Sequence, residues 1–322
     1  MGIGPQMDRA LADNPGVVDP SQKPAPSTND RTAAFWDQRH RTAKGEAHDN
    51  FLRHPLIQAY ISLRAFGQIV GHLDVVAAEL QSRTNPGDEI LSVGCGPAGK
   101  ERALARKLPD RRFVAIDISP ETVGRATAEI QEEGLENLSL ALGDFNDLQL
   151  EGGRYRAILG LGAIHHVEAL ESFWQACSHG LAADGVVLAQ EFVGPNRFQW
   201  TDTQIDIGDA ALRDLVPEAH KVHHQQIRRT PVDVMLALDP SEAVRSRDIL
   251  PTCRDAGYSI EGYASAGCAL LQPVLMYQID TFDPSNWEHN HVLSSLFREE
   301  DRRMRAGELE DDFAMFVARP PR

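Results

Sequence analysis

Three glycines close together, directly after an apolar run, constrain the fold of this chain more than any other feature. The apolar run covers residues 90–93, the glycines are Gly94, Gly96 and Gly99, and a helix-forming segment follows. Glycine lets bare backbone lie against a ligand, and the first turn of a helix offers it unpaired N–H groups. The pattern therefore predicts a strand, a turn and a helix that bind a nucleotide-like group, although it also occurs in ordinary turns and in dinucleotide sites.

Two carboxylates follow at the ends of the next two apolar runs. Residues 112–117 predict a second strand ending in Asp117, and residues 138–142 predict a third strand shortly before Asp144 and Phe145. The carboxyl ends of parallel strands meet at one edge of an open sheet, which is where such sheets bind ligands. A carboxylate at the end of the second strand suits a ribose diol, and a carboxylate beside an aromatic ring suits an adenine.

Each of these two carboxylates has a plainer interpretation. Asp117 lies just before a predicted helix and could cap it, although Ser119 with Pro120 at the first helical position already fills that role. Asp144 could be an ordinary turn residue. We therefore favour ligand binding most strongly at Asp117.

The motifs together resemble the class I S-adenosylmethionine-dependent methyltransferases. The residues that carry the resemblance are Leu-Ser-Val-Gly-Cys-Gly-Pro-Ala-Gly at 91–99, Ala-Ile-Asp-Ile-Ser-Pro-Glu at 115–121 and Gly-Asp-Phe at 143–145. Residues 159–167 and 180–188 are similar to the fourth and fifth strands of that family. The similarity covers roughly residues 85–195, and other segments, such as Gly-Pro-Asn-Arg-Phe-Gln-Trp at 194–200, resemble bacterial methyltransferases of sugar and secondary-metabolite pathways.

The resemblance implies an α/β fold with a doubly wound, Rossmann-like sheet of seven mostly parallel strands. It also implies S-adenosylmethionine as cofactor, with the methionine part against Gly94 and Gly96, the ribose at Asp117, and the adenine beside Asp144. The predicted cofactor-binding residues are Gly94, Cys95, Gly96, Asp117, Ile118, Asp144 and Phe145.

One residue departs from the family pattern. Many members carry an acidic residue two positions before the first glycine, where this chain has Ser92. A serine can hold a bridging water, but it offers no charge to the methionine ammonium group.

Methyl transfer from a sulfonium needs an aligned acceptor and a group that takes its proton. The resemblance places His165 and His166 at the end of the fourth strand, and imidazole titrates in the right pH range, although both could be structural. His54 and Asp49, in the segment before the first strand, are further candidates for proton transfer. The predicted substrate-binding residues are Tyr60, Glu191, Arg197 and Trp200, of which Arg197 could instead make an internal ion pair.

The charge balance and the cysteines narrow the class of substrate and the compartment. With 32 basic and 47 acidic residues the chain has a formal charge of −15, which argues against a nucleic-acid partner. The four cysteines show no paired spacing, and no apolar run is long enough to span a membrane, so we expect a cytoplasmic protein with a small-molecule substrate. The histidines of residues 220–224 could chelate a metal, but they more simply form a solvated helix face, and we expect no metal site.

The chain divides into five predicted parts. They are a disordered tail at 1–30, a helical N-terminal cap at 31–84, the cofactor-binding core at 85–195, a helical insertion that covers the substrate at 196–247, and a C-terminal part at 248–322 that completes the sheet. Within the insertion, residues 238–245 predict a loop that runs into a helix, capped by Asp239 or Ser241.

Two functions of different kinds fit this pattern. The first is methyl transfer to an oxygen, nitrogen or carbon of a small metabolite. The second uses the same fold without methylation, for an intramolecular displacement or elimination that closes a ring such as an aziridine, on an intermediate that is free or bound to a carrier protein. A non-catalytic partner subunit is a third and weaker interpretation, and a homodimer fits any of the three.

Overall fold

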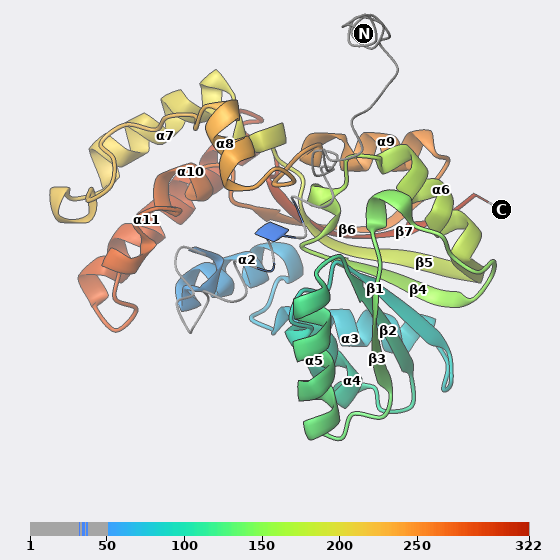
Figure 1. Ribbon diagram of the computed structural model, residues 1–322. Coiled ribbons are helices and arrows are strands. Elements are labelled where there is room, and N and C mark those ends of the chain that lie inside the picture. Colours follow the sequence, from blue (N-terminus) through green and yellow to red (C-terminus); the bar gives the residue numbers. More distant parts are fainter. Residues whose placement is uncertain (1–31, 33, 36, 38–50, 322) are drawn as a thin grey trace, which may run out of the picture.

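The computed structural model describes residues 32, 34, 35, 37 and 51–321, and the predicted tail at 1–30 lies outside them. Seven strands form one mixed sheet in the order β3-β2-β1-β4-β5-β7-β6 (Figure 1). The strands are β1 (Glu89–Val93), β2 (Arg112–Asp117), β3 (Leu138–Leu142), β4 (Tyr155–Leu161), β5 (Leu181–Phe192), β6 (Ser259–Gly267) and β7 (Phe313–Arg319). Strands β1 to β5 are parallel, and β7 runs antiparallel to both β5 and β6. The prediction of a seven-stranded, mostly parallel sheet is confirmed.

The strand order changes direction between β1 and β4. The chain continues from β1 to β2 and β3 on one side, and then returns to the other side of β1 with β4 and β5. A crevice opens at the carboxyl ends of the strands where an open parallel sheet reverses in this way. The order of the strands therefore places a ligand site beyond the ends of β1 and β4.

Helices cover both faces of the sheet. They include α3 (His72–Arg83), α4 (Gly99–Lys107) and α5 (Pro120–Glu132) on one face, and α6 (Leu170–Gly180) and α9 (Ile249–Asp255) on the other (Figure 1). Successive residues of β1 serve the two layers, since Leu91 packs in the cluster that contains Trp174 of α6, and Ile90 packs in the cluster that contains Leu104 of α4. A central parallel strand is buried on both faces for this reason.

A second group of helices lies to one side of the sheet. It consists of α2 (Pro55–Phe66), α7 (Asp202–Leu215), α8 (Val232–Leu238), α10 (Leu271–Leu275) and α11 (Trp287–Arg305) (Figure 1). Apolar residues of α2, α7, α10 and α11 share one core, which includes Ile57, Leu212, Val274 and Leu296. None of the described helices is both long and apolar enough to cross a membrane.

Residues 239–245 form the predicted loop, but the helix expected to begin within this segment, capped by Asp239 or Ser241, is wrong. Helix α8 ends at Leu238, and the next residues form turns in which Asp239 Oδ1 accepts hydrogen bonds from the N–H and the hydroxyl of Ser241. The guanidinium of Arg197 donates to the carbonyl oxygens of Pro240 (2.7 Å) and Glu242 (3.1 Å). These acceptors serve a side chain from a distant part of the chain, so the segment becomes a loop held by Arg197, which we call the 239–245 loop.

The prediction of a solvated helix face at 220–224 is wrong, because residues 221–224 are not helical and His220 is buried. His220 ends the short 3-10 helix Glu218–His220 and is buried, with its ring stacked on Phe282 and its Nδ1 2.9 Å from the hydroxyl of Thr281. His223 is exposed, as expected for a solvated face. Burial against an aromatic ring, which sequence periodicity does not reveal, therefore decides the environment of His220.

Candidate functional site

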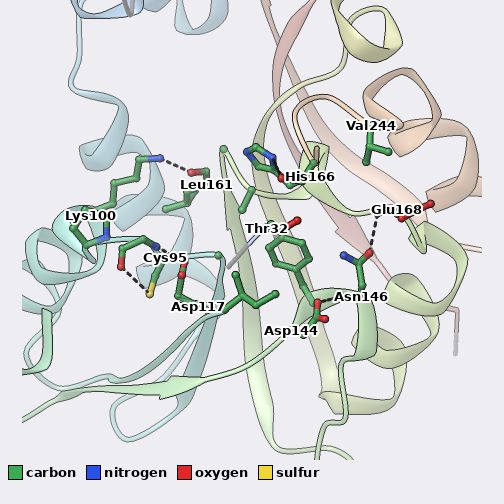
Figure 2. Close-up of a pocket in the computed structure, with 18 of the residues that line it drawn as sticks. Thr32, Cys95, Lys100, Asp117, Asp144, Asn146, Leu161, His166, Glu168 and Val244 are labelled. Carbon is green, nitrogen blue, oxygen red and sulfur yellow. Dashed lines mark hydrogen bonds between the residues drawn. The ribbon is translucent and has the colours of Figure 1, made fainter. Parts of the chain in front are cut away.

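A pocket with a cavity volume of about 210 Å³ lies beyond the carboxyl ends of β1, β2 and β4 (Figure 2). The seven residues predicted to bind the cofactor all line it: Gly94, Cys95, Gly96, Asp117, Ile118, Asp144 and Phe145. Its wall is completed by Asn146, His166 and Glu168, and by Pro240, Ser241 and Val244 of the 239–245 loop. Segments that are far apart in the sequence therefore meet at the edge of the sheet that the motifs indicated.

Gly94, the first glycine of the turn, is packed so closely that it has no room for a side chain. Gly94 has φ of 62°, and a Cβ there would lie 2.8 Å from the Cβ of Ala163 and 3.1 Å from the ring of Phe145. Gly96 also has positive φ, at 51°. Both conformations favour glycine, so the backbone itself forms this part of the pocket wall.

Asp117 connects the end of β2 to the glycine turn. One carboxylate oxygen accepts the N–H of Gly96 at 2.8 Å, and the other accepts the N–H of Ser119 at 3.0 Å. The helix cap itself is Ser119, whose hydroxyl accepts from the N–H of Thr122 while Pro120 occupies the first turn of α5. Asp117 therefore does not cap α5 and keeps its carboxylate at the pocket wall.

The segment after β3 combines a turn with the pocket wall. Asp144 Oδ1 accepts the N–H of Asn146 at 2.8 Å and caps the short 3-10 helix Phe145–Asp147, so Asp144 is a turn residue that also lines the pocket. The side chain of Asn146 accepts the N–H groups of Glu168 and Ala169 and thereby fastens this turn to the start of α6. Sequence analysis missed Asn146, although its place two residues after Asp144 was an available signal.

Two charged residues of α4 lie beside the glycine turn. The hydroxyl of Ser92 donates to Glu101 Oε1 at 2.7 Å, whereas Glu101 Oε2 is buried with no hydrogen-bond partner in the described part of the chain. Burial raises the pKa of Glu101, although the hydrogen bond from Ser92 opposes this shift. Lys100 Nζ donates to the carbonyl oxygen of Leu161 at the end of β4 (Figure 2).

These residues fit the adenosyl and methionyl parts of the cofactor that the sequence predicts. The orphaned carboxylate oxygen of Glu101 can accept from an ammonium group, Lys100 carries the opposite charge, and Gly94 leaves bare backbone between them and Phe145. Ser92 has no carboxylate to offer at this position, but Glu101 of α4 places one directly beside it. Sequence analysis missed both Lys100 and Glu101, because nothing in the spacing showed that Glu101 reaches back to Ser92.

A cluster of histidine and glutamate side chains lies behind the part of the pocket wall that His166 forms. Glu191 is 1% exposed, and its Oε1 accepts the N–H groups of Ala163 and Ile164, both at 2.8 Å. Its Oε2 lies 2.7 Å from Nδ1 of His165, whose Nε2 lies 3.6 Å from Oε1 of Glu242. Glu191 thus holds the turn after β4 in place and orients the ring of His165.

The pKa values of His165 and His166 are shifted in opposite directions. Burial lowers the pKa of His165, but the hydrogen bond and charge of Glu191 outweigh burial and leave it raised. Burial and the neighbouring His165 lower the pKa of His166. The two rings are 4.2 Å apart between centroids, so one positive charge disfavours a second. A proton taken up by the pair therefore binds His165 in preference to His166, and it is His166 that lines the pocket.

The same cluster is the grouping among the described residues that could hold a metal ion. One ligand atom from each of His165, His166 and Glu242 falls within 4.8 Å of the others. Residues 220–224 form no such grouping in the part of the chain that the structure describes. The expectation of no metal site stays a prediction.

Several residues predicted to act on the substrate lie outside this pocket. His54 caps α2, with Nδ1 accepting the N–H of Leu56, and its Nε2 is 3.2 Å from the carbonyl oxygen of Phe282. The hydroxyl of Tyr60 lies within hydrogen-bond distance of Glu300 Oε1 (3.0 Å) and Asp301 Oδ1 (2.9 Å) in the helical group. Both side chains join distant segments outside the pocket, so their predicted roles stay predictions, and Asp49 lies outside the described residues.

The other three predicted substrate residues also have structural roles. Glu191 supports the histidines from behind, and Arg197 holds the 239–245 loop through two backbone carbonyl groups. Trp200 is 2% exposed in the core of the helical group and borders a separate cavity with His224 and Tyr277. None of the three lines the pocket, and their predicted direct contacts with substrate stay predictions. Arg197 still shapes the pocket indirectly, because the loop that it holds forms one wall.

Comparison with known proteins agrees with the geometry of the pocket. The family described as "Methyltransferase domain" matches residues 90–185. Sterol 24-C-methyltransferase ERG6B of Gibberella zeae is 26% identical over 143 residues, which cover 43% of this chain and 37% of that protein. A polyamine aminopropyltransferase of Chromobacterium violaceum is 29% identical over 167 residues, or 49% of this chain and 62% of that protein. The chain thus spans less than two thirds of the length of these relatives.

A solved structure extends the likeness to almost the whole chain. Geranyl diphosphate C-methyltransferase from Streptomyces coelicolor A3(2), in complex with Mg²⁺, geranyl diphosphate and S-adenosyl-L-homocysteine, superposes with a TM-score of 0.54. The alignment covers 93% of this chain and 100% of that one, at 13% sequence identity. At this identity the likeness is one of fold.

Proposed function

The chain carries a class I S-adenosylmethionine-dependent methyltransferase domain at residues 90–185, and we propose that it transfers the cofactor's methyl group to an oxygen, nitrogen or carbon atom of a small molecule. The observation that carries this proposal is the meeting of the glycine turn, Asp117 and Asp144 in one pocket. The bound cofactor supplies a methyl group on a positively charged sulfur. The protein's part is to hold it, to align the acceptor and to accept a proton where the acceptor loses one.

Each part of the cofactor has a proposed partner in the pocket. The carboxylate of Asp117 holds the ribose hydroxyls, and Asp144 with the ring of Phe145 borders the adenine. Gly94 and Gly96 let the backbone approach the methionyl part. These roles rest on the chemistry of the side chains and on their common position around one cavity.

His166 is the proposed proton acceptor. The hydroxyl of Ser241 has one proton and donates it to Asp239 Oδ1 at 2.8 Å, so Nδ1 of His166, 3.1 Å from the same hydroxyl oxygen, is the donor in that contact. The lone pair of the neutral ring is then on Nε2. The lowered pKa of His166 keeps the ring able to accept a proton at neutral pH, whereas the raised pKa of His165 makes His165 a poor base.

The proposed acceptor is a small molecule that enters beside the 239–245 loop. That loop contributes Pro240, Ser241 and Val244 to the pocket wall, and a loop held by a few hydrogen bonds is suited to admit a substrate. One of the relatives is an aminopropyltransferase, so methyl transfer has to be weighed against aminopropyl transfer. The two donors differ in one group, because an aminopropyl group is the amino-acid chain of the cofactor without its carboxylate. Lys100, a cation at the pocket wall, favours the intact methionyl group and hence methyl transfer.

Calorimetric titration with S-adenosylhomocysteine, followed by transfer of a labelled methyl group to a panel of small acceptors, tests the proposal. We expect micromolar binding and label transfer to one chemical class. A folded protein that binds neither S-adenosylmethionine nor its product would contradict methyl transfer and favour the ring-closing alternative.

With an acceptor in hand, His166→Ala should lower the turnover number by about a hundredfold to ten-thousandfold, since this is the usual contribution of a positioned base. The loss of activity in the wild type should fall on the acid side of the pH profile, below the ordinary imidazole value of 6.5, because the pKa of His166 is lowered. The measurement is the turnover number against pH. An unchanged profile in the His166→Ala variant would rule out this base.

A further inference from the structure

The first turn of α4 presents two opposite charges to the pocket. Gly99 begins the helix, and Lys100 and Glu101 follow, and both side chains line the cavity. The neighbouring strand β1 contributes Ser92, which has no charge. Besides Asp117, the charged side chains beside the glycine turn that line the pocket are therefore Lys100 and Glu101 on the helix.

Glu101 is a buried carboxylate in which one of the two oxygens has no hydrogen-bond partner among the described residues. The residue is 2% exposed, Oε1 accepts the hydroxyl of Ser92, and Oε2 has no hydrogen-bond partner among the described residues. Leaving a buried carboxylate oxygen unpaired is costly, and native structures usually have a reason for it. A cationic ligand group beside the glycine turn would supply the missing donor.

Lys100 is bound to a weak partner that a ligand can replace. Its Nζ donates to the backbone carbonyl oxygen of Leu161, which is neutral (Figure 2). Gly162 follows, and a Cβ at that position would lie 3.5 Å from Nζ, so the wall beside the amine is bare. A carboxylate makes a stronger, charge-assisted hydrogen bond with an ammonium group than a carbonyl does.

We propose that Lys100 and Glu101 bind the two charged ends of the amino-acid part of the cofactor, and that they thereby select the intact methionyl group over its decarboxylated form. Lys100 pairs with the carboxylate, and Glu101, held by Ser92, accepts from the ammonium group. This inference rests on the proposed function, because it concerns the same pocket. It makes Lys100 the residue that distinguishes a methyl donor from an aminopropyl donor.

Ligand truncation combined with mutation tests each contact separately. The ligands are S-adenosylhomocysteine, its decarboxylated analogue, its deaminated analogue, and 5′-methylthioadenosine, which lacks both charged groups. The variants are Lys100→Met and Glu101→Gln, with Lys107→Met at the far end of α4 and Glu132→Gln at the end of α5 as matched controls, since both lie outside the pocket. Dissociation constants are measured by calorimetry, and thermal unfolding checks that each variant folds.

Lys100→Met should weaken binding of S-adenosylhomocysteine about tenfold and leave binding of the decarboxylated analogue unchanged. Glu101→Gln should weaken binding of S-adenosylhomocysteine about tenfold or more and leave binding of the deaminated analogue unchanged. The control variants should bind all four ligands as the wild type does. Binding of 5′-methylthioadenosine should be the same in every folded variant.

A loss that is equal for all four ligands, or no loss at all, would overturn the inference. Glu101 is buried and its variant could unfold, but Lys100 is exposed, so the Lys100→Met arm alone decides whether the carboxylate is selected. Failure of the proposed function gives a different result: the wild type would bind neither S-adenosylhomocysteine nor 5′-methylthioadenosine if the cofactor site is absent, and would transfer no labelled methyl group if it binds them for another reaction.

Discussion

Replacing Asp117 with alanine should weaken the binding of S-adenosylhomocysteine at least a hundredfold. The variant loses a carboxylate at the proposed ribose site, and hydrogen bonds to a charged group are worth about 1.5–3 kcal/mol each, so two of them exceed the 2.7 kcal/mol that a hundredfold change requires. It also removes the acceptor of the Gly96 N–H, which holds the glycine turn against β2 at 2.8 Å. Calorimetric titration of the purified variant measures the effect.

Two further variants separate ligand binding from general damage. Asp117→Asn keeps the shape and one acceptor oxygen, so its affinity should lie between those of the wild type and the alanine variant. Asp147→Ala removes an exposed carboxylate of the neighbouring 3-10 helix that does not line the pocket, and it should bind as the wild type does. If Asp117→Ala folds and binds S-adenosylhomocysteine within threefold of the wild type, Asp117 does not hold the ribose.

The meeting of the predicted cofactor-binding residues in one pocket was predictable because they follow consecutive strands. The turn after β1, Asp117 at the end of β2 and Asp144 after β3 come in chain order, and the geometry of a parallel sheet brings them to one edge. The sequence around each of these residues was therefore enough to predict that they lie at one edge of the sheet. Where a residue's partner is distant, the sequence around it was not enough.

Three of the predicted site residues that the structure places outside the pocket have such distant partners. Tyr60 binds Glu300, 240 positions away, and His54 lies against Phe282, 228 positions away. Arg197 takes up backbone acceptors of the 239–245 loop and prevents the helix that local propensity favoured there. Tertiary hydrogen bonds decided these cases, and neither periodicity nor capping signals report them.

Glu191→Ala should lower the free energy of unfolding by about 3 kcal/mol or more. The buried carboxylate accepts the N–H groups of Ala163 and Ile164 and contacts Nδ1 of His165, and each buried donor left without a partner costs about 1–3 kcal/mol. The affected turn carries both histidines and part of the pocket wall. Urea denaturation of wild type and variant measures the difference.

The loss in Glu191→Ala should also depend on pH. Glu191 raises the pKa of folded His165 above its ordinary value of 6.5, so this contribution to stability is fully present below 6.5 and is lost as the pH rises through the folded pKa. The difference from the wild type should therefore be larger at acidic pH than at alkaline pH. Glu191→Gln, which keeps an acceptor for the two backbone N–H groups, should lose less stability, and Glu310→Ala, at an exposed site, should show neither effect. A Glu191→Ala variant within 1 kcal/mol of the wild type at every pH would mean that the turn after β4 holds the histidines without this carboxylate.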